Sequence, residues 1–158
     1  WVASGQSIVS GIEPLESYTG FKGRLQVHSL KPTLALIDDS YNASPSAVKA
    51  AIDTLMTLEG EHLLVLGDMA ELGSDEVTLH LEIGRYAKQQ GVERLMATGP
   101  LMANAVSAFG EGADHFASRE DLVTELKNNL PSEGALLVKG SRSAAMDRVV
   151  DALIEMEK

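Results

Sequence analysis

Two polar clusters follow apolar runs that are typical of buried strands. Residues 38–43 (DDSYNA) follow the run at 34–37, and residues 139–143 (KGSRS) follow the run at 135–138. In open α/β sheets, ligands bind outside the carboxyl ends of the strands. If both clusters lie at that edge, an acidic corner and a basic corner face one cleft.

The acidic corner admits several kinds of chemistry. Asp38 and Asp39 could hold Mg²⁺, bind ribose hydroxyls, or simply cap the turn that follows. Because alternate strand residues face opposite sides of a sheet, one carboxylate should point into the cleft while the other caps or packs. Tyr41 and Asn42 lie before a predicted helix, where they could line a ligand site or form an Asx-turn beside a surface tyrosine.

The basic corner is suited to anions. Lys139, Ser141 and Arg142 combine two positive charges with a hydroxyl ahead of a helix, which fits phosphate or carboxylate, although a charged loop with a serine cap has the same composition. Asp68 follows another apolar run and is either part of a site or part of a turn. His80, between two leucines on a predicted helix, is either a packed histidine or a functional one.

Composition narrows the class of protein. The 158 residues carry a net charge of −10 and 44% apolar residues, so we expect one globular domain with neither nucleic acid nor a membrane as partner. No apolar run approaches the roughly 18 residues of a membrane span, and the start has no signal-peptide pattern, so we expect a cytoplasmic protein. The chain does not begin with Met, which suggests a fragment or processed product. It contains neither a phosphate-loop motif nor a dinucleotide-binding fingerprint.

Strands alternate with helices along the chain. We predict strands at 24–30, 33–37, 62–66, 94–98, 114–116 and 135–138, and helices at 44–58, 75–90, 100–108, 119–130 and 143–156. This rhythm predicts an α/β fold: a three-layer, Rossmann-like domain with a mostly parallel, doubly wound sheet of about six strands, one of them antiparallel, and helices on both faces. Residues 1–22 indicate a short helix followed by a linker.

Several motifs together resemble the C-terminal domain of the Mur ligases. The resemblance rests on GRL at 23–25, DDSYNA at 38–43, VLGDMAELG at 65–73, His80, and KGSRSAAM at 139–146. It implies a Mur ligase C-terminal domain over 23–158, with 1–22 as the tail of the central ATPase domain and the linker. Within the family, the motifs are most similar to the ATP-dependent ligases of peptidoglycan precursor synthesis that add D-alanyl-D-alanine to UDP-N-acetylmuramoyl-tripeptide through an acyl phosphate.

The resemblance also implies residue roles on the nucleotide side. Arg24 would approach the ATP phosphates, and Asp39 would grip the ribose with Asp38 supporting it. Tyr41 and Asn42 would line the same cleft.

On the peptide side, Ser141 and Arg142 would contact the dipeptide or the growing peptide, with Asp68 and His80 as further candidates. Lys139 would help to balance developing negative charge.

The cofactors implied are ATP and Mg²⁺, with the phosphate loop and the metal ligands on a central domain outside this chain and no metal ligands within it. The implied partners are the two substrates and that central domain, on which this domain closes as a lid. We therefore expect the fragment alone to have no ligase activity.

Two other classes remain open from the residues alone. A signalling receiver domain also places paired acids after its first strand, with Mg²⁺ and a phosphoacceptor aspartate. It needs that aspartate after its third strand, however, where this chain has Thr98-Gly99-Pro100. A non-catalytic α/β binding module is the second alternative.

Overall fold

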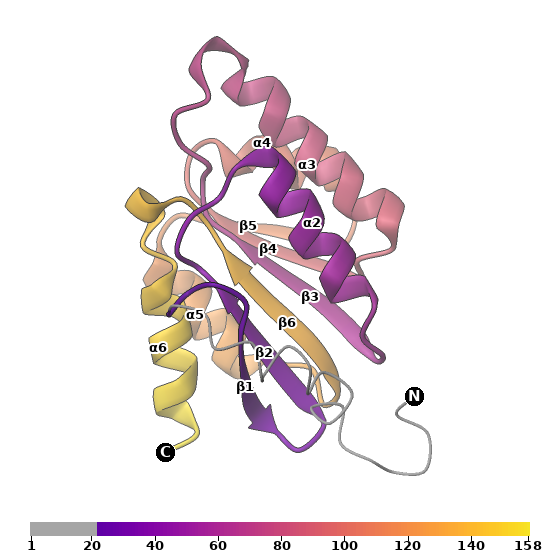
Figure 1. Cartoon of the computed structure of the whole chain (residues 1–158), viewed down its shortest axis with the longest axis vertical. Helices are drawn as coiled ribbons and strands as arrows, with labels where there is room; N and C mark the ends of the chain where they lie inside the picture. Colours follow the sequence, from indigo (N-terminus) through magenta and orange to yellow (C-terminus); the bar gives the residue numbers. More distant parts are fainter. Residues whose placement is uncertain (1–21) are drawn as a thin grey trace.

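The computed structural model describes residues 22–158, so the helix and linker predicted for residues 1–22 lie, except for Lys22, outside the described part (Figure 1). The strands are β1 (Gln26–Lys31), β2 (Leu34–Asp39), β3 (Glu61–Leu66), β4 (Arg94–Thr98), β5 (Ala113–Phe116) and β6 (Gly134–Lys139). The α-helices are α2 (Pro45–Met56), α3 (Glu76–Gln90), α4 (Met102–Phe109), α5 (Arg119–Asn128) and α6 (Asp147–Met156). Two short 3₁₀ turns, η3 (Gly73–Asp75) and η4 (Arg142–Ala144), precede α3 and α6.

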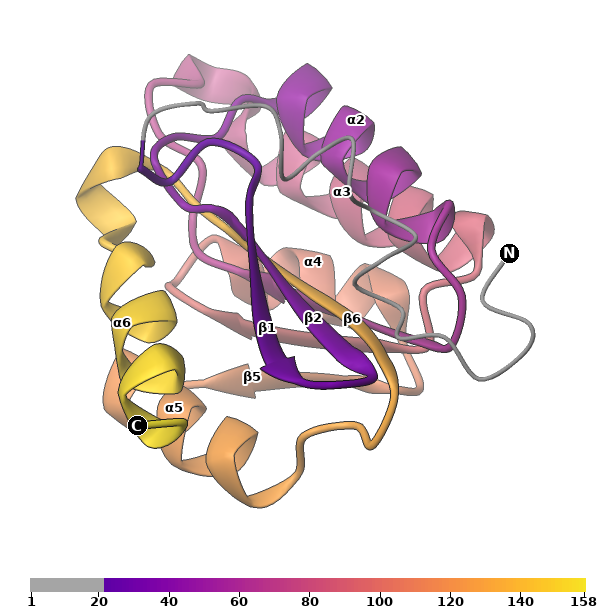
Figure 2. The same ribbon diagram turned by 60° about the horizontal axis from the view of Figure 1, so that its bottom comes forward.

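The six strands form one sheet in the order β1-β2-β6-β3-β4-β5. Only the β1–β2 hairpin is antiparallel; the other four pairings are parallel. The chain moves in one direction from β2 to β5 and then returns to the centre for β6. Because parallel crossovers are right-handed, α2, α3 and α4 cover one face, and α5 and α6 cover the other (Figure 2).

Each face of the sheet has its own aliphatic core. Ile37 and Leu137 pack with α2, α3 and α4, whereas Leu36 and Leu136 pack with α5 and α6. Strands covered on both faces are apolar throughout, and β6 is buried along its whole length. The predicted fold class is therefore confirmed.

Most predicted boundaries agree with the structure to within about three residues. Ser44 and Ser118 accept hydrogen bonds from Ala47 N (3.3 Å) and Asp121 N (3.1 Å), as their N-cap positions predict. The predicted start of the final helix, at residue 143, was wrong, however. Residues 142–146 form η4 and a turn in which Ala145 has a left-handed φ of 53°, so the continuous helix begins only at Asp147.

Among the described residues, no helix has the length and apolar character needed to cross a bilayer.

The α2–α3 contact includes a hydrogen bond of 2.5 Å from the Tyr86 hydroxyl to Asp53. This bond to a carboxylate raises the pKa of Tyr86 above its ordinary value.

Helices α3 and α4 approach each other closely at Gly84. A Cβ placed on Gly84 would lie 2.1 Å from the carbonyl oxygen of Ala105, well inside van der Waals contact. The glycine is therefore required by helix–helix packing and not by its own backbone conformation.

We predict that Gly84→Ala destabilises the protein by about 1–3 kcal/mol, because forced separation of two packed helices outweighs the roughly 1 kcal/mol gain in helix propensity. Urea unfolding measures the difference. Gln89→Ala, at an exposed position of the same helix, is the control and should change stability by less than about 0.5 kcal/mol. A Gly84→Ala variant as stable as the wild type would contradict the packing argument.

Candidate functional site

The loops that follow β2, β3, β4, β5 and β6 gather at the carboxyl edge of the parallel sheet. They form two adjacent features. One is the β2–β6 cluster, which we define as Arg24, Asp38, Asp39, Tyr41, Asn42 and Lys139. The other is a pocket on the side of β3, β4 and β5.

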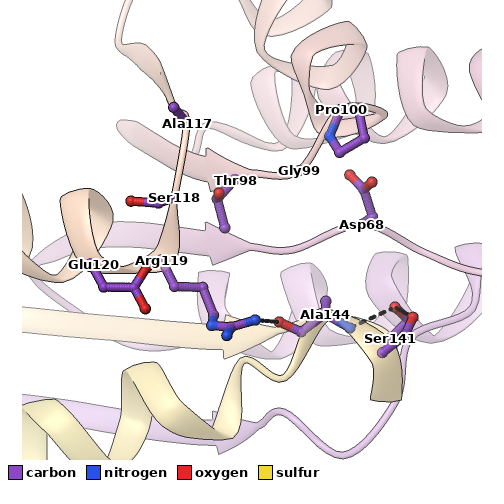
Figure 3. A pocket seen from close by; sticks show the side chains of 11 residues that line it. Asp68, Thr98, Gly99, Pro100, Ala117, Ser118, Arg119, Glu120, Ser141 and Ala144 are labelled. Atoms are coloured by element: carbon purple, nitrogen blue, oxygen red, sulfur yellow. Dashed lines mark hydrogen bonds between the residues drawn. The ribbon is translucent and has the colours of Figure 1, made fainter.

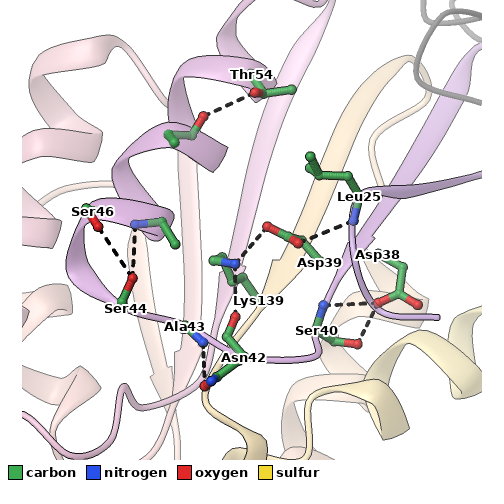
Figure 4. A network of polar contacts seen from close by, with 12 residues as sticks. Leu25, Asp38, Asp39, Ser40, Asn42, Ala43, Ser44, Ser46, Thr54 and Lys139 are labelled. Carbon is green, nitrogen blue, oxygen red and sulfur yellow. Dashed lines mark hydrogen bonds and ion pairs between the residues drawn. The ribbon is translucent and has the colours of Figure 1, made fainter. Parts of the chain in front are cut away.

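Asp39 and Lys139 form a buried ion pair at the centre of the cluster. They are register partners on the adjacent strands β2 and β6, and Lys139 Nζ lies 2.7 Å from Asp39 Oδ2 (Figure 4). Their side chains are only 13% and 5% exposed, respectively. The ammonium also donates to the carbonyl oxygen of Asn42 at 2.9 Å. The acidic and basic corners predicted to face one cleft therefore do meet, but they bind each other.

The second oxygen of Asp39 positions the entry to the sheet. Asp39 Oδ1 accepts a hydrogen bond from Leu25 N at 3.3 Å. Leu25 has a left-handed φ of 50°, an uncommon conformation for a large side chain. Asp39 thus helps to hold the turn that carries Arg24.

Asp38 and Asp39 face opposite sides of the sheet, as strand alternation predicts. Asp38 is buried, and its Oδ1 accepts from the backbone N–H (3.1 Å) and the hydroxyl (2.5 Å) of Ser40. Its role in the structure is to form the turn after β2, in support of the residues that follow.

Tyr41 is the exposed aromatic of the cluster, with 42% of its surface accessible. The Arg24 guanidinium lies 4.3 Å from the centre of its ring, and the Arg142 guanidinium lies 5.6 Å from it. Tyr41 N also donates to Gly23 O at 2.8 Å. The GRL turn and the KGSRS loop, far apart in sequence, therefore meet over one ring, where cation–π attraction favours both arginines.

The remaining predicted residue of this cluster, Asn42, turns inward along its own loop. Its Oδ1 accepts from Ala43 N at 2.8 Å, while its carbonyl is the second acceptor for Lys139. This bond reaches the next residue, whereas an Asx-turn needs the N–H two residues on, so the Asx-turn predicted as an alternative at Asn42 is not the one the structure forms. Asp38, whose Oδ1 accepts from Ser40 N, has that spacing instead.

The pocket has a volume of about 390 Å³ and is lined from four loops (Figure 3). Asp68 follows β3, residues 98–100 are the end of β4 and the loop after it, residues 117–120 are the end of the loop after β5 and the start of α5, and the β6 loop contributes Ser141, Ser143 and Ala144. Small side chains and hydroxyls dominate this lining. The KGSRS loop thus serves both features, since Ser141 faces the pocket while Arg142 reaches Tyr41.

Asp68 has a structural function in the pocket wall. Its two carboxylate oxygens accept from Leu101 N (3.2 Å) and Met102 N (2.8 Å), which caps the start of α4. Its own carbonyl oxygen accepts from Ser141 N at 2.9 Å. Asp68 therefore links the loops after β3, β4 and β6.

His80 is fully buried behind the loop after β3. Met69 N donates to its Nε2 at 3.1 Å, so the ring proton belongs on Nδ1, which lies 2.6 Å from Glu76 O and donates to it. With both nitrogens bonded inside the protein, the contacts of His80 support the loop and do not face the pocket.

Four polar pocket residues were not predicted from the sequence: Thr98, Ser118, Arg119 and Glu120. Ser118 carried a recognisable capping signal, but no local pattern shows that the loop after β5 faces the loop after β6. Among residues 22–158, no group of three or more acidic or histidine side chains is arranged to hold a metal ion.

The chain belongs to the Mur ligase family. Residues 23–142 match the family described as "Mur ligase, glutamate ligase domain". The chain is 38% identical over 155 residues to the UDP-N-acetylmuramoyl-tripeptide--D-alanyl-D-alanine ligase of Escherichia coli, covering 97% of this chain and 33% of that protein. It is 35% identical to the Bacillus subtilis ligase of the same name, covering 92% of this chain and 35% of that protein.

Solved structures agree with this assignment. MurF from Acinetobacter baumannii superposes with a TM-score of 0.78 at 28% identity, covering 98% of this chain and 35% of that one. The fold is also that of a Thermotoga maritima MurF ligase solved in complex with ADP, with a TM-score of 0.77 at 22% identity, covering 94% of this chain and 36% of that one. The chain spans about a third of the length of the relatives it matches, and the match excludes the receiver-domain alternative.

We predict that Lys139→Met destabilises the protein by about 3–5 kcal/mol, because it leaves the Asp39 carboxylate buried without a counter-ion. The double variant Asp39→Asn, Lys139→Met should recover most of this loss in urea unfolding. Lys22→Met, which removes an exposed ion pair with Asp151, is the control and should cost less than about 1 kcal/mol. If the two lysine variants lost equal stability, the buried ion pair would contribute no more than an exposed one, and the prediction would be contradicted.

We also predict that His80→Leu destabilises the protein by about 1–3 kcal/mol, since the Met69 N–H loses its acceptor inside the protein. His80→Gln supplies an amide oxygen and should recover part of the loss. Hydrogen exchange at the Met69 amide, read by NMR, should accelerate in the leucine variant more than in the glutamine variant. Unchanged exchange in both would contradict the proposed bond.

Proposed function

We propose that this chain is the C-terminal domain of an ATP-dependent ligase that adds D-alanyl-D-alanine to UDP-N-acetylmuramoyl-tripeptide in peptidoglycan precursor synthesis. The observation that carries this proposal is the 38% identity to a ligase of that name over 97% of the chain. We place residues 1–22 at the end of a central ATPase domain, residues 23–158 in this domain, and the whole protein in the cytoplasm.

The β2–β6 cluster has the chemistry that ATP requires. ATP would supply the phosphoryl group that turns the tripeptide carboxylate into an acylating group. Arg24 is suited to the phosphates, and the exposed ring of Tyr41 offers a stacking surface. Asp39 retains unused lone pairs for ribose hydroxyls, with Asp38 and Asn42 shaping the loop around it.

Lys139 supports this cluster through Asp39. Its ammonium already has two protein partners and is almost inaccessible, so its contacts favour positioning Asp39. A direct role for Lys139 in balancing charge would require the pair to open.

The pocket is our proposed dipeptide site. Its small lining residues suit the methyl side chains of D-alanyl-D-alanine, and Ser141 provides a hydroxyl on the wall formed by the loop after β6. Three further residues would support the pocket through their contacts within the protein. Asp68 holds the start of α4, His80 supports the loop after β3, and Arg142 lies beside Tyr41.

The domain acts as one half of a composite site in this proposal. The phosphate loop and the Mg²⁺ ligands belong to the central domain, and closure of this domain over it excludes water from the acyl phosphate. The positive charges of Arg24 and Arg142 beside Tyr41 would attract ATP phosphates bound to the central domain.

We predict that the full-length protein releases phosphate only when ATP, UDP-muramoyl-tripeptide and D-alanyl-D-alanine are all present, and that the 158-residue chain alone does not. In the full-length protein, Tyr41→Ala should raise the KM for ATP about tenfold, consistent with loss of a stacking and cation–π surface. The KM for the dipeptide should stay within twofold.

Val77→Ala is the matched control, because Val77 is a comparably exposed apolar side chain, at 45%, outside both features. Its kinetic constants should equal those of the wild type. Dipeptide-independent turnover, or ligation by the isolated chain, would overturn the proposal.

A further inference from the structure

Arg119 is a pocket residue that none of the family motifs contains. It is the first residue of α5, where the positive end of the helix dipole disfavours a cation and the following acids, Glu120 and Asp121, suit the position better. A residue that opposes its local electrostatics is expected to serve something other than helix stability.

The guanidinium of Arg119 is mostly unused by the protein. Nη1 donates to Ala144 O at 2.9 Å, which places the group against the β6 loop. Nε is buried without a hydrogen-bond partner, and Nη2 has none among the described residues. Buried donors without partners are rare in folded proteins, because each costs its hydration free energy.

The charge of Arg119 is also unpaired. Within residues 22–158, no carboxylate lies within ion-pair distance of it, and Asp68, the acid across the pocket, is already bonded to the start of α4. Figure 3 shows Arg119 reaching from the start of α5 towards Ala144, on a different side of the pocket from Asp68. An unpaired guanidinium at the wall of a small cavity favours an anionic ligand.

The form of the pocket points to a carboxylate. The lining also contains hydroxyls from Ser118, Ser141 and Ser143. It has two carboxylates as well: Asp68, which is bonded to the start of α4, and Glu120, which is exposed to solvent. Arg119 is the one positive charge in this lining. A phosphate would be better matched by the pair of arginines at Tyr41. Because Nη1 is bonded to Ala144 O and Nε is buried, Nη2 is the donor of Arg119 that remains to bind a carboxylate through a charge-assisted hydrogen bond.

We propose that Arg119 binds the terminal carboxylate of the incoming dipeptide and makes a free carboxylate a requirement for that substrate. This assignment rests on the proposed function, since it identifies the recognition group of the same pocket. Arg119 is a binding residue here, and the attacking amine lies at the other end of the dipeptide.

The test compares D-alanyl-D-alanine with D-alanyl-D-alaninamide, which lacks the negative charge, as substrates of the full-length enzyme. The wild type should prefer the acid. In Arg119→Gln, the KM for the acid should rise roughly 10- to 100-fold, as expected for loss of a charged hydrogen-bonded pair, while the KM for the amide changes less than threefold. The KM for ATP should not change, and Arg119→Lys should recover part of the preference.

Arg85→Gln is the charge-matched control, because Arg85 is exposed on α3 outside the pocket. It should leave both dipeptide constants unchanged. Equal increases in KM for acid and amide in Arg119→Gln would show that Arg119 only supports the wall through Ala144, and would overturn the assignment, as would no change. A wild type that does not use D-alanyl-D-alanine at all would instead overturn the proposed function and, with it, this assignment.

Discussion

The buried ion pair between Asp39 and Lys139 is the interaction on which the edge of this domain depends. It joins the last residues of two adjacent strands that are 100 positions apart in the chain. A buried pair of this kind adds little net stability compared with apolar residues, but each partner strongly restricts where the other lies. Its free lone pairs and donors reach Leu25 and Asn42, so the pair also positions the turn that carries Arg24 and the loop that carries Tyr41.

The two glycine-containing loops after β3 and β6 behave as one structural unit. Gly67 N donates to Lys139 O, and Ser141 N donates to Asp68 O. A Cβ on Gly67 or Gly140 would lie 2.8 Å or 2.6 Å from the Met146 side chain, so both glycines are needed for this close contact. The GDM and KGSR motifs therefore have an architectural role as well as a proposed chemical one, and the pocket wall follows from their packing.

Much of the fold could be predicted because its signals are local. Apolar runs marked the strands, helical periodicity and serine caps marked the helices, and their alternation indicated a parallel sheet. The start of the last helix could not be predicted in this way. Ala145 has no intrinsic preference for a left-handed conformation, and its place between η4 and α6 reflects packing of the β6 loop.

The candidate site also has features that local sequence predicts and features that depend on tertiary packing. Local sequence was enough to identify which polar residues follow buried strands, and so which loops reach the functional edge, because strand direction and side-chain alternation are short-range properties. Only the tertiary structure established that Lys139 is the partner of Asp39, that Asp68 caps α4, and that Arg119 faces the same pocket as Ser141. Those relations depend on strand order, register and the face on which α5 returns, and these are decided by packing of the whole sheet between its two layers of helices.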